Sequence, residues 1–227
     1  METKFHAMPS VFVMEHDVPA EMVTDLNLYL DNYLKQKKRK SLAGTLVGQI
    51  KKGQQLLMDH EDKKIVEFSN MLCGLGAHYI NEFSRATGAT YKTNKQVAMD
   101  ELWSVHSYER DYNPIHSHGT KTMMGISATM WTKVPQQILD LPTAGTSDYS
   151  LYNSSGHSDG CLAFQYGQGH VTDGETLKPA PSFVIRPEVG KLYLFPSWLQ
   201  HMVYPFQGKG ERRTVAANLN CWDVQAA

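Results

Sequence analysis

The pattern of short apolar runs in the second half of the sequence limits this chain to a small set of folds. From residue 99 onward, runs such as "ELWSVHSYE", "GCLAFQY", "GKLYLFP" and "RTVAANLNCW" are separated by Gly, Pro, Asn and Asp. Many short strand-like runs between turn signals are typical of a sandwich or a barrel. We therefore predict an all-β unit over residues 99–227 and a chain that is mainly β.

The first part of the sequence, residues 1–98, is predicted to be mostly helical and to pack on the β unit. Residues 19–40 and 61–87 carry apolar side chains at a spacing of mostly three or four, which is typical of a helix with one buried face. Residues 41–60 are interpreted as a linker that could contain a short helix. The run "KQKKRK" at 35–40 could contact phosphates, but a solvated helix end explains it better, because cations suit a helix C-terminus.

Composition and charge exclude several classes of partner. The chain has 227 residues with a net charge of −1, so no basic field draws it to nucleic acid. It has no run of about 18 apolar residues that could span a membrane, and "METKFHAMPS" does not resemble a signal peptide. Its 3 cysteines, without a CxxC motif, are expected to be reduced thiols. We expect a cytoplasmic protein, and the sequence leaves its oligomeric state open.

Three histidines are candidates for one metal site. His116 and His118 lie two apart in "NPIHSHG", so in a strand their side chains would point to the same face. Such a pair can be half of a metal site or simply a polar strand face. A third ligand would have to come from a distant strand, and His201 after "GKLYLFPSWLQ" could supply it. Taken alone, His201 is more simply a core or surface histidine.

The segment "ERRTVAAN" has two different faces when it is interpreted as a strand. Arg212 and Thr214 share a small, polar face with Ala216 and Asn218, whereas the face that begins with Arg213 is mostly apolar. A cavity wall suits the first face and packing against a helix suits the second. The planar guanidinium of arginine suits bidentate binding of a carboxylate. We predict that Arg212 and Thr214 bind an anion. Arg213 is the competing assignment, and its replacement by alanine should weaken anion binding only mildly.

The order of these motifs resembles the Fe(II)/2-oxoglutarate-dependent oxygenases. "NPIHSH", "SATMWTKVP", "GCLAF", "PEVGKLYLFPSWLQH" and "ERRTVAAN" follow one another as in a bacterial and phage branch related to prolyl hydroxylases. The likeness covers roughly residues 101–222; "FPSWLQH" followed by an arginine is specific, whereas "HSH" alone is weak. The resemblance implies a double-stranded β-helix, the jelly-roll core also found in cupins, flanked by α-helices.

The resemblance implies a role for each matching residue. His116 and His201 match iron ligands, and Arg212 matches the arginine that binds the remote carboxylate of 2-oxoglutarate, with the Thr214 hydroxyl beside it. Tyr108 matches a tyrosine that is often found on the strand leading into the site, and it could equally be a core residue.

His118 stands where the wider superfamily usually has Asp or Glu. Three neutral imidazoles are a reasonable iron site, so we favour ligation by His118; the alternative is a site with two protein ligands and His118 beside them. Asp111 is a poor substitute carboxylate, because a position five residues before His116 has the wrong parity in a continuous strand.

The resemblance implies an Fe(II)- and 2-oxoglutarate-dependent dioxygenase, expected to be a hydroxylase, that couples decarboxylation of 2-oxoglutarate to oxidation of a prime substrate by O2. That substrate could be a protein, a peptide or a small molecule, and the long loop at 136–159 is expected to help select it. Two alternatives stay open: a three-histidine cupin-type metalloenzyme that does not use 2-oxoglutarate, and a non-catalytic jelly-roll binding module. Trp103, Trp131 and Trp198 could line the cavity or pack in the core.

Overall fold

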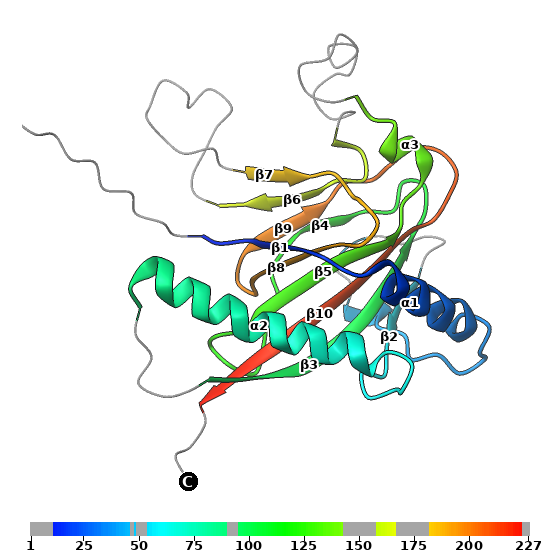
Figure 1. Cartoon of the computed structure of the whole chain (residues 1–227). Helices are drawn as coiled ribbons and strands as arrows, with labels where there is room; N and C mark the ends of the chain where they lie inside the picture. The colour runs from blue at the N-terminus through cyan, green and yellow to red at the C-terminus, as the bar shows by residue number, and fades with distance from the viewer. Residues whose placement is uncertain are drawn as a thin grey trace, which may run out of the picture.

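The structure, a computed structural model, consists of two antiparallel sheets with helices on one side (Figure 1). It describes residues 11–45, 48, 54–89, 95–142, 158–166 and 182–223. The helical segments are α1 (Ala20–Tyr33), η1 (Ala43–Thr45), α2 (Val66–Thr87) and α3 (Gln136–Leu139). The strands are β1 (Met14–Asp17), β2 (Gln54–Leu57), β3 (Lys95–Ser107), β4 (Asn113–His116), β5 (Ile126–Lys133), β6 (Leu162–Gln165), β7 (Ser182–Ile185), β8 (Lys191–Pro196), β9 (Gln200–Val203) and β10 (Arg212–Asp223).

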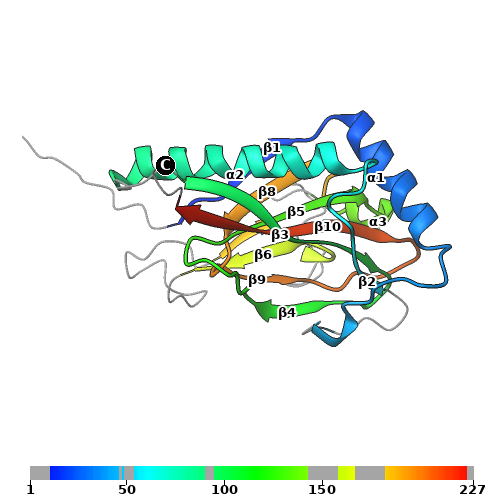
Figure 2. The same cartoon turned by 90° about the horizontal axis from the view of Figure 1, so that it is seen from below.

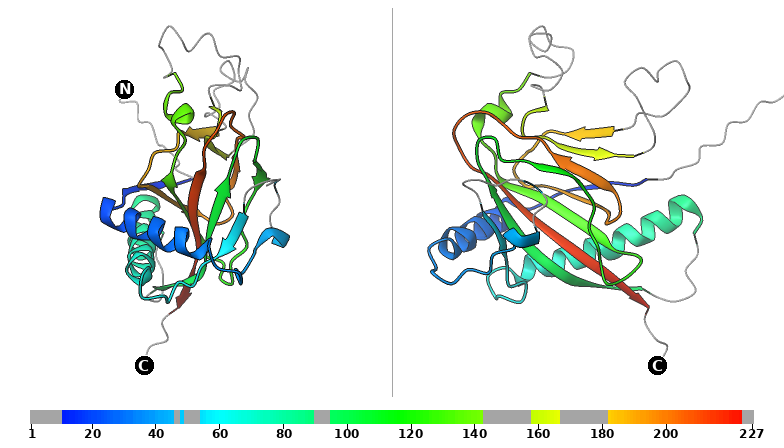
Figure 3. Two further views of the ribbon diagram at one scale, coloured as in Figure 1. Left: turned by 90° about the vertical axis from the view of Figure 1, so that its right-hand side faces the viewer. Right: turned by 180° about the vertical axis from the view of Figure 1, so that it is seen from behind.

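The two sheets and the helices form three layers. The larger sheet has 6 strands in the order β1-β8-β5-β10-β3-β2, and the smaller has 4 strands in the order β4-β9-β6-β7. Figure 2 shows α1 and α2 on one side of the larger sheet and the smaller sheet on its other side, and the left view of Figure 3 shows both helices on that same side. The chain is therefore mainly β with antiparallel sheets, as predicted, and the arrangement is consistent with a jelly roll.

The side chains of strand β10 point alternately into the core beneath the helices and into the space between the two sheets. Val215, Ala217 and Leu219 pack into the core beneath the helices, together with Leu26 and Phe68. Their neighbours in sequence point the other way, toward the space between the sheets. This alternation follows from the period of two in a strand, and it matches the two faces predicted from "ERRTVAAN".

A second apolar core fills one end of the space between the two sheets. Its buried members are Trp131, Leu162, Phe164, Ile185, Tyr193, Phe195 and Leu199. The aromatic rings of Phe164 and Phe195 meet edge to face, with centroids 4.7 Å apart. Two members of this core, Leu162 and Phe195, also border the open volume between the sheets.

The predicted helices are present, with shorter bounds. Helix α1 ends at Tyr33, before "KQKKRK", and Arg39 donates to the carbonyls of Leu34 and Gln36 at 2.7 Å each. This cation at a helix C-terminus supports the interpretation of the basic run as a helix end. Helix α2 begins at Val66 rather than residue 61 and ends at Thr87, where Gly88 caps it with a φ of 69° that favours glycine.

The N-terminal part also supplies strands that the sequence analysis did not predict. β1 pairs with β8, and β2, within the segment interpreted as a linker, pairs with β3. Both are 4 residues long and lie at the edges of the larger sheet. Their sequences, MEHD and QQLL, show neither apolar–polar alternation nor a continuous apolar run, so they carry no strand signal. Among the helices of the described ranges, none is long and apolar enough to cross a membrane.

Candidate active site

A cavity of about 280 Å³ opens between the two sheets. The larger sheet lines it with side chains of β3, β5 and β10, and the smaller sheet lines it with β4 and β9. Its volume lies near the lower end of ligand pockets, which are typically ~300–1,000 Å³. His116, His118, His201, Arg212 and Thr214 all line this cavity.

The three predicted histidines come together at this cavity. His116 at the end of β4 pairs directly with His201 of β9. His118 lies just beyond β4, where its backbone N–H donates to the carbonyl of Ser197 at 2.9 Å. One ring nitrogen from each histidine lies within 4.8 Å of those of the other two, and the Nε2 atoms of His118 and His201 are 3.2 Å apart. A single metal ion between them could therefore bind all three.

Backbone carbonyls orient two of the three rings. Nδ1 of His116 lies 2.7 Å from the carbonyl oxygen of Pro114, and Nδ1 of His201 lies 3.0 Å from that of Leu199. A carbonyl can only accept, so in each ring Nδ1 carries the proton and Nε2 keeps its lone pair. This second hydrogen bond is the usual way in which proteins fix a metal-binding imidazole.

The ring of His118 is held differently. It stacks on Trp103 with centroids 5.4 Å apart and an interplanar angle of 21°, and it hydrogen-bonds the Asn218 side chain. Asn218 in turn accepts a hydrogen bond of 2.8 Å from the Ser127 hydroxyl. Stacking and hydrogen bonding therefore fix this ring as well, although it lies outside a strand.

Burial keeps the three imidazoles neutral. It lowers the pKa of His118 to about 4 and that of His201 to about 3, with the neighbouring His116 adding to both effects. Burial also lowers the pKa of His116. At neutral pH all three rings therefore have a lone pair available for a metal.

Arg212 places a buried cation in the same cavity. The residue is 3 % exposed, and its guanidinium donates to the carbonyls of Gly160 and Tyr204 at 2.8 and 3.3 Å and to the Ser107 hydroxyl at 3.4 Å. Its Nε has no hydrogen-bond partner, and no ion pair links it to a carboxylate in the described part of the chain. Burial lowers the pKa of Arg212 to about 10, so it remains charged at neutral pH. A buried cation with an unused donor suits an anionic ligand.

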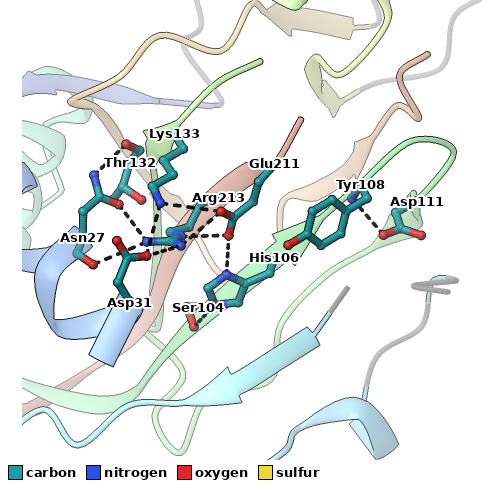
Figure 4. Close-up of polar contacts among 10 residues, drawn as sticks. All are labelled: Asn27, Asp31, Ser104, His106, Tyr108, Asp111, Thr132, Lys133, Glu211 and Arg213. Atoms are coloured by element: carbon teal, nitrogen blue, oxygen red, sulfur yellow. Dashed lines mark hydrogen bonds and ion pairs between the residues drawn. The ribbon is translucent and has the colours of Figure 1, made fainter. Parts of the chain in front are cut away.

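The structure places Arg213 and Tyr108 away from the cavity. Arg213 lies on the opposite face of β10, beneath α1 (Figure 4). Tyr108 follows the last residue of β3 and is not among the residues that line the cavity. Its role in binding the cosubstrate stays a prediction. Asp111 accepts a hydrogen bond from the Tyr108 backbone N–H at 2.9 Å and is not in the histidine group.

The three tryptophans have three different environments. Trp103 lines the cavity, Trp131 is buried in the core between the sheets, and Trp198 is 57 % exposed. The small polar residues of the cavity wall, namely Ser107, Asn113, Ser127 and Thr129, were not predicted from the sequence. Strand parity could have identified Ser107, because it lies four residues after Trp103.

Comparison with known families decides what kind of protein has this site. The family model described as "Putative 2OG-Fe(II) oxygenase" matches residues 101–218, more than half of the chain. The chain belongs to this family of 2OG-Fe(II) oxygenases. It is therefore an oxygenase of the class that uses Fe(II), 2-oxoglutarate and O2, as the resemblance implied. No curated protein sequence matches this oxygenase.

Solved structures show that the fold of this oxygenase is shared. A Pseudomonas putida prolyl-4-hydroxylase superposes with a TM-score of 0.53 and 12% identity over 95% of this chain and 93% of that chain. HygX from Streptomyces hygroscopicus, with nickel and 2-oxoglutarate bound, gives 0.54 and 8% over 92% and 82%. A Trichoplax adhaerens prolyl hydroxylase in complex with a hypoxia inducible factor peptide fragment gives 0.51 and 12% over 94% and 83%. At such identities the likeness establishes the fold.

Proposed function

We propose that this oxygenase is a hydroxylase with a double-stranded β-helix core, in which His116, His118 and His201 bind iron and Arg212 binds 2-oxoglutarate. The observation that carries the proposal is that one cavity contains three neutral histidines and a buried guanidinium whose Nε has no hydrogen-bond partner. The histidines could bind a metal, and the guanidinium could bind a carboxylate of a dicarboxylate ligand.

The donor set fits Fe(II) and 2-oxoglutarate together. Imidazole is a suitable ligand for iron, and three neutral rings leave the charge of the metal uncompensated. The dianion of 2-oxoglutarate would supply that charge at the metal and would place its remote carboxylate at Arg212. Thr214, which lines the cavity on the same face of β10, would add a hydroxyl donor. When bound, iron and 2-oxoglutarate supply an oxidant from O2, with succinate and CO2 as by-products.

The residues of the chain would orient the reactants and exclude water. The carbonyls of Pro114 and Leu199 would keep two rings in the metal-binding tautomer. Trp103, stacked on His118, would shield the metal from solvent. Arg212 would fix the far end of 2-oxoglutarate, so that its reacting end lies at the metal.

Anaerobic titration with Fe(II), with and without 2-oxoglutarate, tests the proposal. We expect a metal-to-ligand charge-transfer absorption band that requires both components and that is unchanged in His78→Ala, a control histidine exposed on α2. Iron binding that 2-oxoglutarate does not alter would favour the cupin-type metalloenzyme instead. Absence of iron binding would favour the non-catalytic module.

For the prime substrate we propose a peptide or a protein, modified at a prolyl or another residue, rather than a nucleic acid. Two structures of similar fold are prolyl hydroxylases, and one of them holds a peptide. Most of the loop expected to select the substrate, residues 143–157, lies outside the described residues. Mass spectrometry of peptides incubated with Fe(II), 2-oxoglutarate and the enzyme would detect the gain of one oxygen atom.

A cytoplasmic location is also proposed, since Cys73, Cys161 and Cys221 are free thiols.

A further inference from the structure

A cluster of charged residues lies on the face of the larger sheet opposite the cavity (Figure 4). It joins α1 to the ends of β3, β5 and β10. We name it the α1 clamp and define it by Asn27, Asp31, His106, Lys133, Glu211 and Arg213. None of these side chains lines the cavity, so direct contact with iron or 2-oxoglutarate does not explain the cluster.

The centre of the α1 clamp is a two-point ion pair between neighbours of Arg212. Arg213 is 1 % exposed, and its Nε and Nη2 donate to the two carboxylate oxygens of Glu211 at 2.9 and 3.0 Å. Paired guanidinium–carboxylate bonds of this kind fix orientation as well as distance. The residues immediately before and after Arg212 are thus bound to each other.

Helix α1 contributes the next contacts. The Arg213 guanidinium donates to the carboxylate of Asp31 at 2.7 Å and to the side-chain oxygen of Asn27 at 3.1 Å. The Asn27 amide donates to the carbonyl of Thr132 at 2.9 Å, and Lys133 donates to Asp31 at 3.2 Å. Through these bonds α1 is tied to both β10 and β5.

Strand β3 holds Glu211 from the other side. Nδ1 of the buried His106 lies 2.6 Å from the Glu211 carboxylate, and Nε2 of the same ring lies 3.0 Å from the Ser104 hydroxyl. Both nitrogens of His106 therefore have partners, and the ring is fixed. Glu211 is consequently fixed by β3 as well as by Arg213.

The position of Arg212 in its strand explains why contacts of the neighbouring residues Glu211 and Arg213 affect its side chain. Arg212 is the first residue of β10, and the pairing of β10 with β5 shifts register between Arg213 and Thr214. Arg212 pairs with Ser107 of β3, but its pairing partner is missing on the β5 side, where the ladder begins at Arg213. A strand end that is paired on one side and lies beside an irregularity is held less firmly than the strand centre. The Arg212 side chain makes its bonds to Gly160, Tyr204 and Ser107 only if the backbone at this point is held.

We propose that the α1 clamp positions Arg212 for the remote carboxylate of 2-oxoglutarate, with Arg213, Glu211 and Asp31 as positioning residues. The inference rests on the proposed function, in which Arg212 binds that carboxylate. It assigns to helix α1 a part in cosubstrate affinity from the far side of the sheet.

The test compares two ligands in anaerobic Fe(II) protein. 2-Oxoglutarate uses the arginine, whereas 2-oxopentanoate has the same metal-binding end and lacks the remote carboxylate. The preference of a variant is the ratio of its affinities for the two, measured by the charge-transfer band. The first variant is Asp31→Asn, at a side chain that is 46% exposed and so tolerates substitution. The second is Arg213→Lys, which keeps the positive charge and removes the planar guanidinium with its paired donors. Glu15→Gln, which removes a similar ion pair with Lys191 at the far edge strand, is the matched control.

We expect Asp31→Asn and Arg213→Lys to reduce the preference for 2-oxoglutarate by about tenfold, because small misplacements of a binding group have effects of this order. Affinity for 2-oxopentanoate should stay unchanged, as should both affinities in Glu15→Gln. Equal losses for both ligands, or no loss, would overturn the positioning role. Arg212→Gln separates the two proposals. If Arg212→Gln abolishes the preference for 2-oxoglutarate while Asp31→Asn and Arg213→Lys retain it, only the positioning role of the α1 clamp is wrong. If Arg212→Gln retains the preference, the assignment of Arg212 as the residue that binds the remote carboxylate is wrong.

Discussion

At the scale of single residues, His118 decides what kind of iron site this oxygenase has. Its Nε2 lies 3.2 Å from that of His201, and its ring is fixed by Trp103 and Asn218. The Asp111 carboxylate is engaged by the backbone of Tyr108. Among the described residues, no carboxylate belongs to the group that could hold the metal. The geometry therefore favours three imidazole ligands over two.

Substitution of His118 tests this assignment. His118→Ala should weaken Fe(II) binding by more than ~100-fold, beyond the roughly 10–100-fold typical of residues that only orient a ligand. His118→Asp, which supplies a carboxylate from the same position, should keep measurable binding. Succinate formed from 2-oxoglutarate without a prime substrate gives the second readout. Wild-type iron affinity and turnover in His118→Ala would show that two histidines suffice.

At the scale of elements, ion pairs between α1 and the sheet give Arg213 a structural role. The sequence predicts that Arg213→Ala has only a mild effect on anion binding, and this prediction does not concern stability. The structure buries the Arg213 guanidinium against Glu211 and Asp31. Loss of this partner would leave Glu211 without its main cation, and breaking a buried pair typically costs about 3–5 kcal/mol. Since Asp31 is partly exposed, we expect the lower end of that range.

The same cluster predicts a dependence of stability on acid. Burial would raise the pKa of Glu211, but hydrogen bonds and charge from His106 and Arg213 lower it to about 2, from an ordinary 4.5. The unfolded chain therefore binds this proton more readily, so the stabilisation is present above pH 4.5 and is lost as the pH falls toward 2. The gain amounts to at most about 3 kcal/mol.

Thermal unfolding from pH 2 to 6 would measure this effect. In Glu211→Gln the decline of melting temperature with acid should be shallower than in the wild type, and the melting temperature at pH 6 should be lower. Glu67→Gln, a substitution of an exposed carboxylate on α2, is the control for the change of one charge. Parallel curves for the wild type and Glu211→Gln would contradict the assignment.

At the scale of the whole molecule, the features predicted correctly from the sequence are those that depend on hydrophobic periodicity and on the order of motifs. The strand-like runs became strands, the two faces of β10 were assigned correctly, and the histidines expected to converge do so. Strands β1 (MEHD) and β2 (QQLL) were missed, because they show neither apolar–polar alternation nor a continuous apolar run, unlike the equally short β6 and β7. The α1 clamp was missed because its polar residues lie far apart in sequence and meet only after α1 packs on the sheet.

A crystal structure of the anaerobic complex with Mn(II) and 2-oxoglutarate tests most directly whether one cavity between the sheets binds both iron and 2-oxoglutarate, through His116, His118, His201 and Arg212. We predict that anomalous scattering places the metal at bonding distance, about 2.0–2.3 Å, from a nitrogen of each histidine, with the remote carboxylate of 2-oxoglutarate paired with Arg212. A metal bound elsewhere, or a cosubstrate whose remote carboxylate does not contact Arg212, would contradict the account.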